Sequence, residues 1–207
     1  ENYNFKKNTK GFSYQDKLGQ MNLPLPNLMG DFQISNISTA IVTARNLRQF
    51  KITESHIKKA ITKIRSEGRL QSITHGKLRK YVSKNNQILI DGAHNVLAAS
   101  EIRKYLETLN SGRKIFMILG MMANKEHKKF IQIFKDKICS IIALNIPNQE
   151  NFIGKEKLSQ IARSCGIPAE TEDSIKSALK KVSAKNDSAI IFCTGSLYFA
   201  GEILNLN

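Results

Sequence analysis

The sequence predicts an α/β fold: a Rossmann-like C-terminal domain with a mostly parallel sheet, preceded by a mainly helical N-terminal portion. After residue 66, segments of helical periodicity alternate with continuous apolar runs, which are IFMILG (115–120), SIIALNI (140–146) and AIIFCTG (189–195). Strands that are apolar on both faces are covered by helices on both sides, and their alternation with helices indicates βαβ units. Before residue 66, apolar residues recur at helical spacing instead.

The N-terminal portion, residues 1–66, begins with a polar segment. Its first 30 residues are punctuated by glycine and proline and predict loops or strand remnants rather than a compact unit. From Asp31, the stretch DFQISNISTAIVTARNL has the apolar spacing of a packed helix. Thr53 precedes Glu54 and a second apolar series, so a second helix is expected to begin with Thr53 as its N-cap.

Residues 67–207 form the second predicted domain, which has a common domain size. Strands are expected near 87–92, 114–120, 139–146 and 188–194. Helices are expected near 96–109, 126–136, 155–164, 173–184 and 197–205. Right-handed crossovers between such strands produce a mostly parallel sheet.

Length and composition exclude a membrane protein. The chain has 207 residues, of which 41% are hydrophobic, enough for one large domain or for one domain plus part of another. No apolar run approaches the ~20 residues of a membrane-spanning helix, and ENYNFKKNTK lacks the apolar middle of a signal peptide. We therefore expect a cytoplasmic protein. The chain starts at Glu1 without an initiator Met, as expected of a fragment or a processed product.

Cysteine and histidine spacing argues against a bound metal. The cysteines are odd in number and form no CxxC pair, so reduced thiols in or near a core are expected; they are Cys139, Cys165 and Cys193. The histidines show no HExxH or other ligand spacing; they are His56, His75, His94 and His127. We predict no protein-bound zinc.

The net charge of +15 allows two interpretations. A basic surface attracts anions, including nucleic acid and small polyanions such as nucleotides. Alternatively the charge is compositional, because the cations are mostly lysines scattered along the chain without an Arg-rich block or interleaved aromatics. We favour the second interpretation and predict no nucleic-acid partner.

Polar residues follow the strand QILI abruptly in the segment QILIDGAHNVLAAS, residues 87–100. In an open parallel sheet, ligands bind outside the carboxyl ends of the strands. Asp91 has the oxygens to accept two hydrogen bonds from a sugar diol, Gly92 allows close backbone approach, and His94 and Asn95 begin the next helix. The alternative is that Asp91 and Asn95 cap that helix and that His94 is a surface residue.

Two further strand ends carry groups suited to anions. Thr194, Gly195 and Ser196 leave the AIIFC strand and open the last helix, where backbone N–H groups and a hydroxyl suit a carboxylate or phosphate; a simple helix cap is the alternative. Lys125 lies in the loop after IFMILG, and a lone lysine is usually a solvated charge. We expect these loops to converge in space.

Together these motifs resemble a known family. DGAHN after a strand, GRLQ upstream, a GxxxxKxx loop and a terminal GSLY helix resemble the C-terminal domain of folylpolyglutamate synthase, or of the bifunctional dihydrofolate synthase/folylpolyglutamate synthase, in the Mur ligase superfamily. LMGDFQISNISTAIVTA resembles the G-x-H-Q-x-x-N-A helix at the end of that family's central ATPase domain. The resemblance spans roughly residues 23 to 204. It implies that residues 1–66 are a C-terminal remnant of the central ATP-binding domain and that 67–207 are the glutamate ligase domain.

The resemblance implies an ATP-dependent acid–amino-acid ligase. Such an enzyme phosphorylates a carboxylate, and the amino group of L-glutamate attacks the acyl phosphate to form an amide. By position, Gln33 and Asn36 match the helix that borders the adenine. Arg69 of GRLQ matches an arginine that reaches the nucleotide phosphates, where its guanidinium stabilises the transferring group. Asp91 matches the acid associated with the ribose and domain closure.

On the amino-acid side, His94, Lys125 and Ser196 match positions near the incoming glutamate, where a cation and a hydroxyl suit its carboxylates. The resemblance thus implies catalytic roles for Arg69, His94 and Lys125. DGAHN becomes the C-terminal domain's face of a site shared between domains.

The sequence departs from the family pattern at several positions. Phe32 replaces the histidine of HQ, Ser66-Glu67 replaces Trp-Pro before GRLQ, and Val96 stands where proline follows DGAHN. Asn124 and Glu126 replace the two acids around Lys125.

No G-x-x-x-x-G-K-[ST] motif occurs, because Gly76-Lys77 and Gly154-Lys155 lack the earlier glycine and the following hydroxyl. The resemblance implies ATP and Mg²⁺, with most Mg²⁺ ligands in an N-terminal ATPase domain that this sequence does not contain, so the chain alone is expected not to turn over ATP. The expected partners are ATP, L-glutamate and dihydropteroate or folate, without nucleic acid or membrane, in an enzyme that is a monomer at full length. The alternatives are another Mur-type ligase, such as a peptidoglycan-precursor enzyme, and a non-catalytic module that binds nucleic acid through its lysines; GRLQ and GSLY favour the folate branch.

Overall fold

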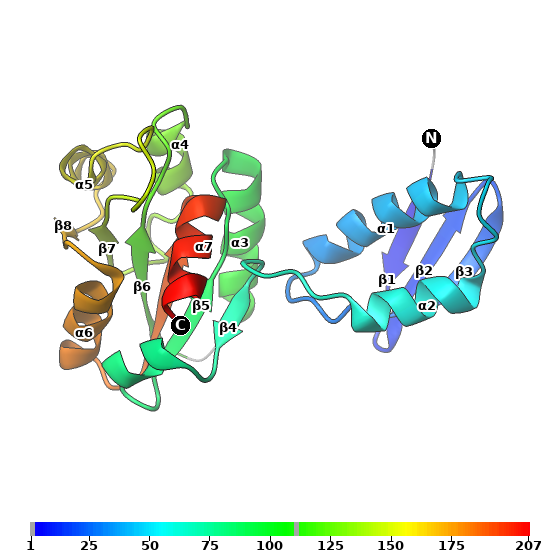
Figure 1. Ribbon diagram of the computed structural model, residues 1–207, viewed down its shortest axis with the longest axis horizontal. Helices are drawn as coiled ribbons and strands as arrows, with labels where there is room; N and C mark the ends of the chain where they lie inside the picture. The colour runs from blue at the N-terminus through cyan, green and yellow to red at the C-terminus, as the bar shows by residue number, and fades with distance from the viewer. Residues whose placement is uncertain (1–2, 110–111) are drawn as a thin grey trace. The chain divides into compact units, whose positions relative to one another are not determined.

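The computed structural model describes residues 3–109 and 112–207, which divide into two compact units, Glu1–Glu67 and Gly68–Asn207 (Figure 1). The division falls beside the boundary expected from the sequence. Each unit has its own hydrophobic core.

The first unit contains an antiparallel sheet that was not expected from the sequence. Its strands pair in the order β1-β2-β3; they are β1 (Asn4–Lys7), β2 (Gly11–Asp16) and β3 (Gly19–Pro24). The expectation of loops or strand remnants in residues 1–30 is therefore wrong, and the unit is not mainly helical. The missed signal is a short alternation: Phe12 and Tyr14 on β2, and Met21 and Leu23 on β3, point to the same core and are separated by polar residues.

The two helices of this unit match the prediction. Helix α1 (Phe32–Arg45) buries Ile34, Ile37 and Ile41 against the sheet. Helix α2 (Glu54–Lys63) begins after Thr53, whose Oγ1 accepts a hydrogen bond from the His56 N–H at 3.3 Å, so the predicted N-cap is confirmed.

The second unit is built on a six-stranded sheet in the order β4-β5-β9-β6-β7-β8. Its strands are β4 (Gln71–Ile73), β5 (Gln87–Ile90), β6 (Lys114–Leu119), β7 (Ser140–Ala143), β8 (Ala169–Thr171) and β9 (Ala189–Thr194). Strand β4 pairs antiparallel with β5, and the other pairs are parallel. The mostly parallel α/β fold is therefore confirmed. The last strand lies between β5 and β6, so the loops after β5, β9 and β6 leave the sheet side by side.

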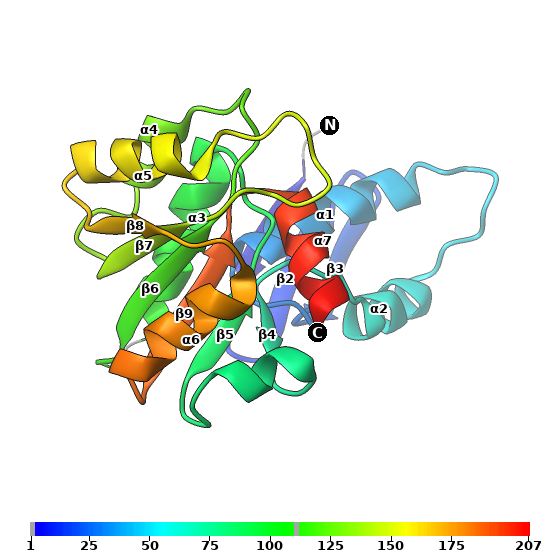
Figure 2. The ribbon, with the colours of Figure 1, turned by 60° about the vertical axis from the view of Figure 1, so that its left-hand side comes forward.

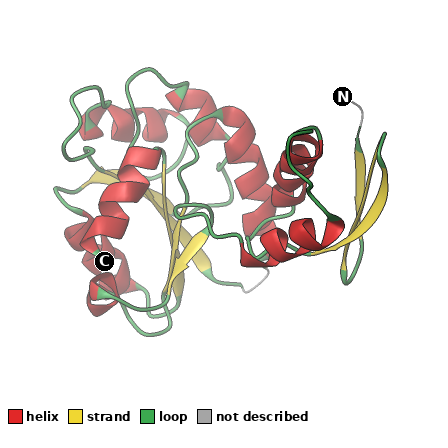
Figure 3. Ribbon diagram, turned by 45° about the vertical axis from the view of Figure 1, so that its right-hand side comes forward, coloured by secondary structure: helices red, strands yellow, loops and turns green. Residues whose placement is uncertain are grey.

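Helices cover both faces of this sheet (Figure 3). They are α3 (Val96–Thr108), α4 (His127–Gln132), α5 (Lys155–Ser164), α6 (Ile175–Lys185) and α7 (Leu197–Leu206), with a short 3-10 helix, η1 (Lys77–Tyr81). Figure 2 shows α6 and α7 on the near side of the sheet, where their apolar residues pack on Ile88, Ile118 and Ile191. Phe192, the next residue along β9, contacts Phe134 after α4, with ring centroids 6.2 Å apart.

The predicted strands and helices of this unit are confirmed within a few residues. Helix α4 ends at Gln132 rather than near residue 136, because the chain turns after it and Asp136 adopts a left-handed backbone with φ of 64°. Three short elements were not predicted: β4, η1 and β8.

Among the described residues, no helix is long and apolar enough to cross a membrane. All three cysteines are free; Cys165 and Cys193 are buried, as expected, whereas Cys139 is exposed.

Candidate functional site

The loops at the carboxyl ends of β5, β9 and β6 are hydrogen-bonded to one another. The Asp91 N–H donates to the Cys193 carbonyl at 3.0 Å, and the Gly195 N–H donates to the Ala93 carbonyl at 3.0 Å. The Gly120 N–H donates to the Thr194 carbonyl at 3.2 Å. The structure thus brings these strand-end loops together, as expected from the sequence. We call residues 68–70, 91–95, 120 and 194–196 the rim.

Glycines allow the rim to close this tightly. A Cβ atom on Gly92 would lie 2.3 Å from Leu197 Cδ2, and one on Gly195 would lie 2.5 Å from the Gly120 carbonyl oxygen. Gly195 also has φ of 115°, in the region that favours glycine. Backbone N–H and carbonyl groups of neighbouring loops can therefore approach without side chains between them.

Asp91 lies beneath the rim rather than on its surface. It is 2% exposed, and its Oδ2 and Oδ1 atoms accept hydrogen bonds from the Leu70 N–H at 2.8 Å and the Ala93 N–H at 2.7 Å. Burial raises the pKa of Asp91, while those two N–H groups and the positive charge of Arg69 oppose the rise. The interpretation in which Asp91 offers its oxygens to a sugar diol does not fit this burial, because both oxygens serve the protein's own backbone.

Arg69 stands on a turn with two left-handed neighbours. Gly68 has φ of 66° and Leu70 has φ of 46°. The Gly68 carbonyl accepts from the Gly92 N–H at 2.8 Å, and the Gly68 N–H donates to Gln71 Oε1 at 2.9 Å. The Arg69 side chain is partly exposed, and in the described part of the chain its guanidinium makes no hydrogen bond or ion pair. The turn therefore presents an unpaired cation at the rim.

His94 is fixed through one ring nitrogen. Its Nδ1 lies 2.9 Å from the Gly92 carbonyl oxygen. Since a carbonyl can only accept, Nδ1 carries the proton, and Nε2 of the neutral ring is left as an acceptor. The side chain is partly exposed, and in the part of the chain that the structure describes Nε2 makes no hydrogen bond.

Ser196 and Asn95 are helix caps. Asn95 Oδ1 accepts from the Ala98 N–H at 2.9 Å at the start of α3, and Ser196 Oγ accepts from the Tyr198 N–H at 3.1 Å at the start of α7. The capping interpretation is confirmed for both. Ser196 is 2% exposed, so its side chain is buried beneath the rim, which does not favour the expected contact of its hydroxyl with an anion.

Lys125 lies in the loop that leaves the rim at Gly120. It is partly exposed, and its carbonyl accepts from the His127 N–H at 3.0 Å. Within the described residues no contact joins its side chain to Arg69 or His94. Its role near glutamate stays a prediction.

Gln33 and Asn36 lie in the first unit, at the start of α1. Asn36 Nδ2 donates to Gln33 Oε1 at 3.0 Å. Gln33 is 4% exposed, and its buried Nε2 has no partner among the described residues. Because buried amide groups are nearly always hydrogen-bonded, this orphaned donor fits a polar ligand such as a base. Their contact with adenine stays a prediction.

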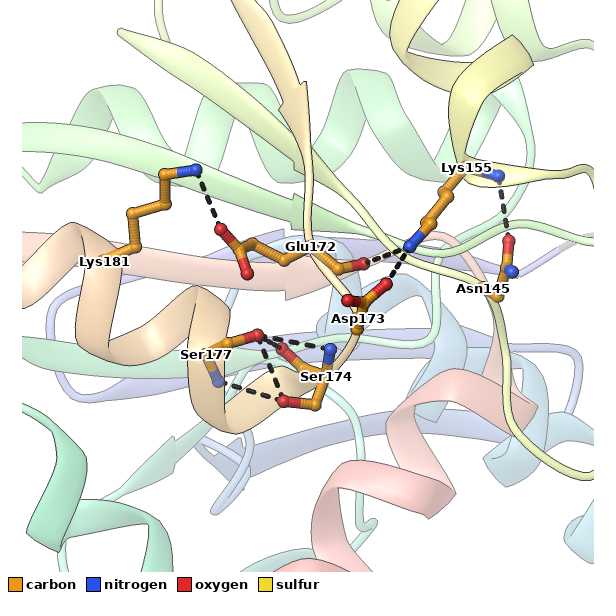
Figure 4. A network of polar contacts seen from close by, with 7 residues as sticks. All are labelled: Asn145, Lys155, Glu172, Asp173, Ser174, Ser177 and Lys181. Carbon is orange, nitrogen blue, oxygen red and sulfur yellow. Dashed lines mark hydrogen bonds and ion pairs between the residues drawn. The ribbon is translucent and has the colours of Figure 1, made fainter.

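A second polar cluster lies at the carboxyl ends of β7 and β8 (Figure 4). Lys155 pairs with Asp173, and its N–H donates to Asn145 Oδ1 at 2.9 Å. Lys181 pairs with Glu172 at 2.8 Å. Each lysine is paired with a carboxylate. Hydrogen bonds to these carboxylates raise the pKa of both lysines. Lys155, which follows Gly154, is therefore engaged by the protein and not held free for a phosphate.

The described residues form no closed, all-protein metal site. No group of three or more His, Cys, Asp or Glu side chains in 3–109 and 112–207 is placed to hold a metal ion.

Two residues of the site were missed by sequence reasoning. Gln71 closes the Arg69 turn, and Leu70 carries its left-handed backbone. Gln71 follows Gly68 at a turn spacing that is visible in GRLQ, but a left-handed leucine has no local signal, because leucine rarely adopts that conformation.

The comparison with protein families settles where this chain belongs. Residues 71–206 match a family model described as the C-terminal domain of dihydrofolate synthetase. The chain belongs to this family. The matched region contains DGAHN, Lys125 and the TGS cap, whereas Arg69 and the first unit precede it.

Relatives of the dihydrofolate synthetase family match over most of the chain. A dihydrofolate synthetase of Saccharomyces cerevisiae is 25% identical over 193 residues, 87% of this chain and 45% of the relative. A folylpolyglutamate synthase of Lacticaseibacillus casei is 26% identical over 93% of this chain and 42% of the relative. A UDP-N-acetylmuramoyl-L-alanyl-D-glutamate–L-lysine ligase of Streptococcus thermophilus is 26% identical over 96% of this chain and 40% of the relative. The chain thus spans less than half the length of these relatives.

Solved structures share the fold. Escherichia coli FolC, solved in complex with DHPP and ADP, matches with a TM-score of 0.79 and 18% identity, over 99% of this chain and 45% of that one. This likeness supports the architecture described above.

Proposed function

We propose that the chain is the C-terminal part of an ATP-dependent ligase that adds L-glutamate to dihydropteroate, to folate, or to both. The observation that carries the proposal is the rim: an unpaired Arg69 and the free Nε2 of His94 stand at the carboxyl edge of the sheet in a member of the dihydrofolate synthetase family. The names of its relatives, and the DHPP and ADP in the E. coli structure, support this choice of substrates.

The proposed reaction has two steps. A carboxylate oxygen of the pteroate or folate attacks the terminal phosphorus of ATP, and ADP leaves. The amino nitrogen of glutamate then attacks the acyl carbon, phosphate leaves, and the nitrogen loses a proton. Arg69 stabilises negative charge on the transferring phosphoryl group, because a guanidinium forms charge-assisted hydrogen bonds to its oxygens. His94 accepts a hydrogen bond from the incoming amine through Nε2, and Lys125 attracts its carboxylates.

The proposal also assigns a role to two residues of the first unit. Gln33 and Asn36 are assigned to the base, since the orphaned Gln33 amide needs a polar partner. Most Mg²⁺ ligands are assigned to the preceding ATPase domain that the resemblance implies. The 207-residue chain alone is therefore expected to release no phosphate from ATP. We also propose a cytoplasmic protein that is monomeric at full length.

Substrate dependence tests the proposal. A longer protein that carries this chain behind a G-x-x-x-x-G-K-[ST] segment should release ADP and phosphate only when glutamate and dihydropteroate, or glutamate and folate, are both present. Phosphate release in the absence of both dihydropteroate and folate, or in the absence of glutamate, would refute the proposal.

The S. thermophilus relative favours a second candidate, a peptidoglycan-precursor ligase. A UDP-sugar peptide offered in place of dihydropteroate separates the two. Phosphate release with the peptide and lysine, and none with dihydropteroate and glutamate, would favour the peptidoglycan-precursor ligase over the folate enzyme.

A further inference from the structure

We infer that Asp91 and Gln71 are positioning residues that hold the Arg69 turn in one conformation, so that the guanidinium meets an anion without rearrangement. The anion-binding part rests on the proposed function of Arg69. The holding part rests only on the hydrogen bonds of the turn.

The turn needs support because its backbone is unfavourable. Leu70 adopts φ of 46°, which places its Cβ close to its own carbonyl oxygen, and Gly68 before Arg69 is also left-handed. A residue in this conformation persists only where its surroundings determine it.

Three hydrogen bonds supply that support. The Leu70 N–H donates to Asp91 Oδ2 at 2.8 Å, and the Gly68 N–H donates to Gln71 Oε1 at 2.9 Å. The Gly92 N–H donates to the Gly68 carbonyl at 2.8 Å. Leu70 is also fully buried, which anchors the turn in the core. Both neighbours of Arg69 are therefore fixed, although no hydrogen bond of the described chain reaches the guanidinium itself.

Asp91 supports the turn without neutralising Arg69. Each of its oxygens accepts from a backbone N–H, and no ion pair between Asp91 and Arg69 forms among the described residues. A fixed backbone lowers the conformational freedom that is lost when an anion binds, because only the Arg69 side chain remains to be ordered.

The test uses the 207-residue chain with ADP as the probe. Asp91→Ala and Gln71→Ala each remove an acceptor from the turn. Gln71→Glu keeps the acceptor and adds a negative charge. Ser174→Ala is the matched control, because it removes a side-chain acceptor from a backbone N–H at the start of α6, outside the rim. Arg69→Ala defines the complete loss of the guanidinium. Hydrogen exchange of the Leu70 amide and the dissociation constant for ADP, both followed by NMR, are measured for each chain.

We expect Asp91→Ala to accelerate Leu70 exchange on the order of tenfold, the effect of losing about one hydrogen bond. Asp91→Ala and Gln71→Ala should weaken ADP binding toward the level of Arg69→Ala. Gln71→Glu should keep Leu70 exchange within about twofold of the wild type, and Ser174→Ala should stay within about twofold in both measurements. If Asp91→Ala does not fold, the comparison of Gln71→Ala with Ser174→Ala still decides the outcome, because Gln71 is partly exposed.

The two parts of the inference fail differently. Leu70 exchange that is unchanged in Asp91→Ala overturns the holding role. ADP binding that weakens in Arg69→Ala but not in Asp91→Ala or Gln71→Ala overturns the positioning role alone. Wild-type and Arg69→Ala chains that bind ADP equally overturn the anion-binding part, whereas the proposed function of Arg69 fails only if Arg69→Ala leaves phosphate release by the longer protein unchanged.

Discussion

Burial raises the pKa of Asp91, because a carboxylate that is 2% exposed has lost most of its hydration. The protein keeps this group because its two oxygens bind the backbone N–H groups of Leu70 and Ala93. The sequence places Asp91 correctly at a strand end, but its burial depends on Leu70, which is 21 positions away in the chain. Such a long-range contact has no local signal, so the residue could be found from the sequence while its role could not.

The raised pKa of Asp91 predicts how stability changes with pH. In the folded state the carboxyl binds its proton more tightly than in the unfolded chain, so its favourable contribution is complete below the usual pKa of 3.8 and is lost as pH rises through the higher folded value. The free energy of unfolding of the wild type, compared with Asp91→Asn, should therefore fall as the pH rises above 3.8 toward the higher folded pKa. Urea unfolding of both proteins at several pH values measures this difference; a rise in the same interval would contradict it.

Gly195 predicts a large effect from a single methyl group. Alanine there meets the Gly120 carbonyl oxygen at 2.5 Å and a backbone φ of 115°, so Gly195→Ala should lower the free energy of unfolding by about 2–4 kcal/mol. Gly201 lies in α7, and a Cβ atom there would meet no other group within 4 Å, so Gly201→Ala should raise it by about 0.5–1 kcal/mol. Equal effects of the two changes in chemical denaturation would refute the close packing of the rim.

At the scale of elements, a strand or helix can be predicted when its packing produces a recognisable pattern of apolar residues in the local sequence. Strands β6 and β9 are continuously apolar because both faces are covered, and they were predicted within a residue or two. Strands β4 and β8 have only three residues each, too few for a periodic pattern. Strands β2 and β3 alternate apolar and polar residues. The many polar and glycine residues of this segment favoured loops in the prediction, and this short alternation was missed.

Two phenylalanines of the antiparallel sheet should differ in how much their replacement by alanine lowers stability. Phe12 is fully buried in the core of the first unit, so Phe12→Ala should lower the stability of that unit by about 3–5 kcal/mol. Phe5 on β1 is 41% exposed, and Phe5→Ala should cost less than about 0.5 kcal/mol. Denaturation followed by the tyrosines of the unit measures both; a small cost for Phe12→Ala would mean that the sheet is not formed as described.

At the scale of the whole chain, the two units each enclose a core of their own. The family match lies within the second unit, at residues 71–206. All residues of the rim also belong to the second unit. The hydrogen bonds that build the rim join residues between Gly68 and Gly195, so no residue of the first unit takes part in them.

This organisation predicts that residues 68–207 fold when produced alone. Their core and their sheet are complete within that segment. The segment should unfold cooperatively, and its Leu70 amide should be as protected as in the 207-residue chain. A segment that lacks a cooperative transition, while the 207-residue chain has one, would show that the second unit depends on the first.

The central claim is that Arg69 is the cation through which this domain acts on the transferred phosphoryl group. The most direct measurement is the rate of phosphate release by the proposed full-length ligase with saturating ATP, dihydropteroate and glutamate, compared among wild type, Arg69→Ala and Arg65→Ala. Arg65 is exposed and serves as the matched control. We predict that Arg69→Ala slows release by about 100-fold or more while Arg65→Ala leaves it unchanged. An Arg69→Ala enzyme that releases phosphate at the wild-type rate would contradict the account.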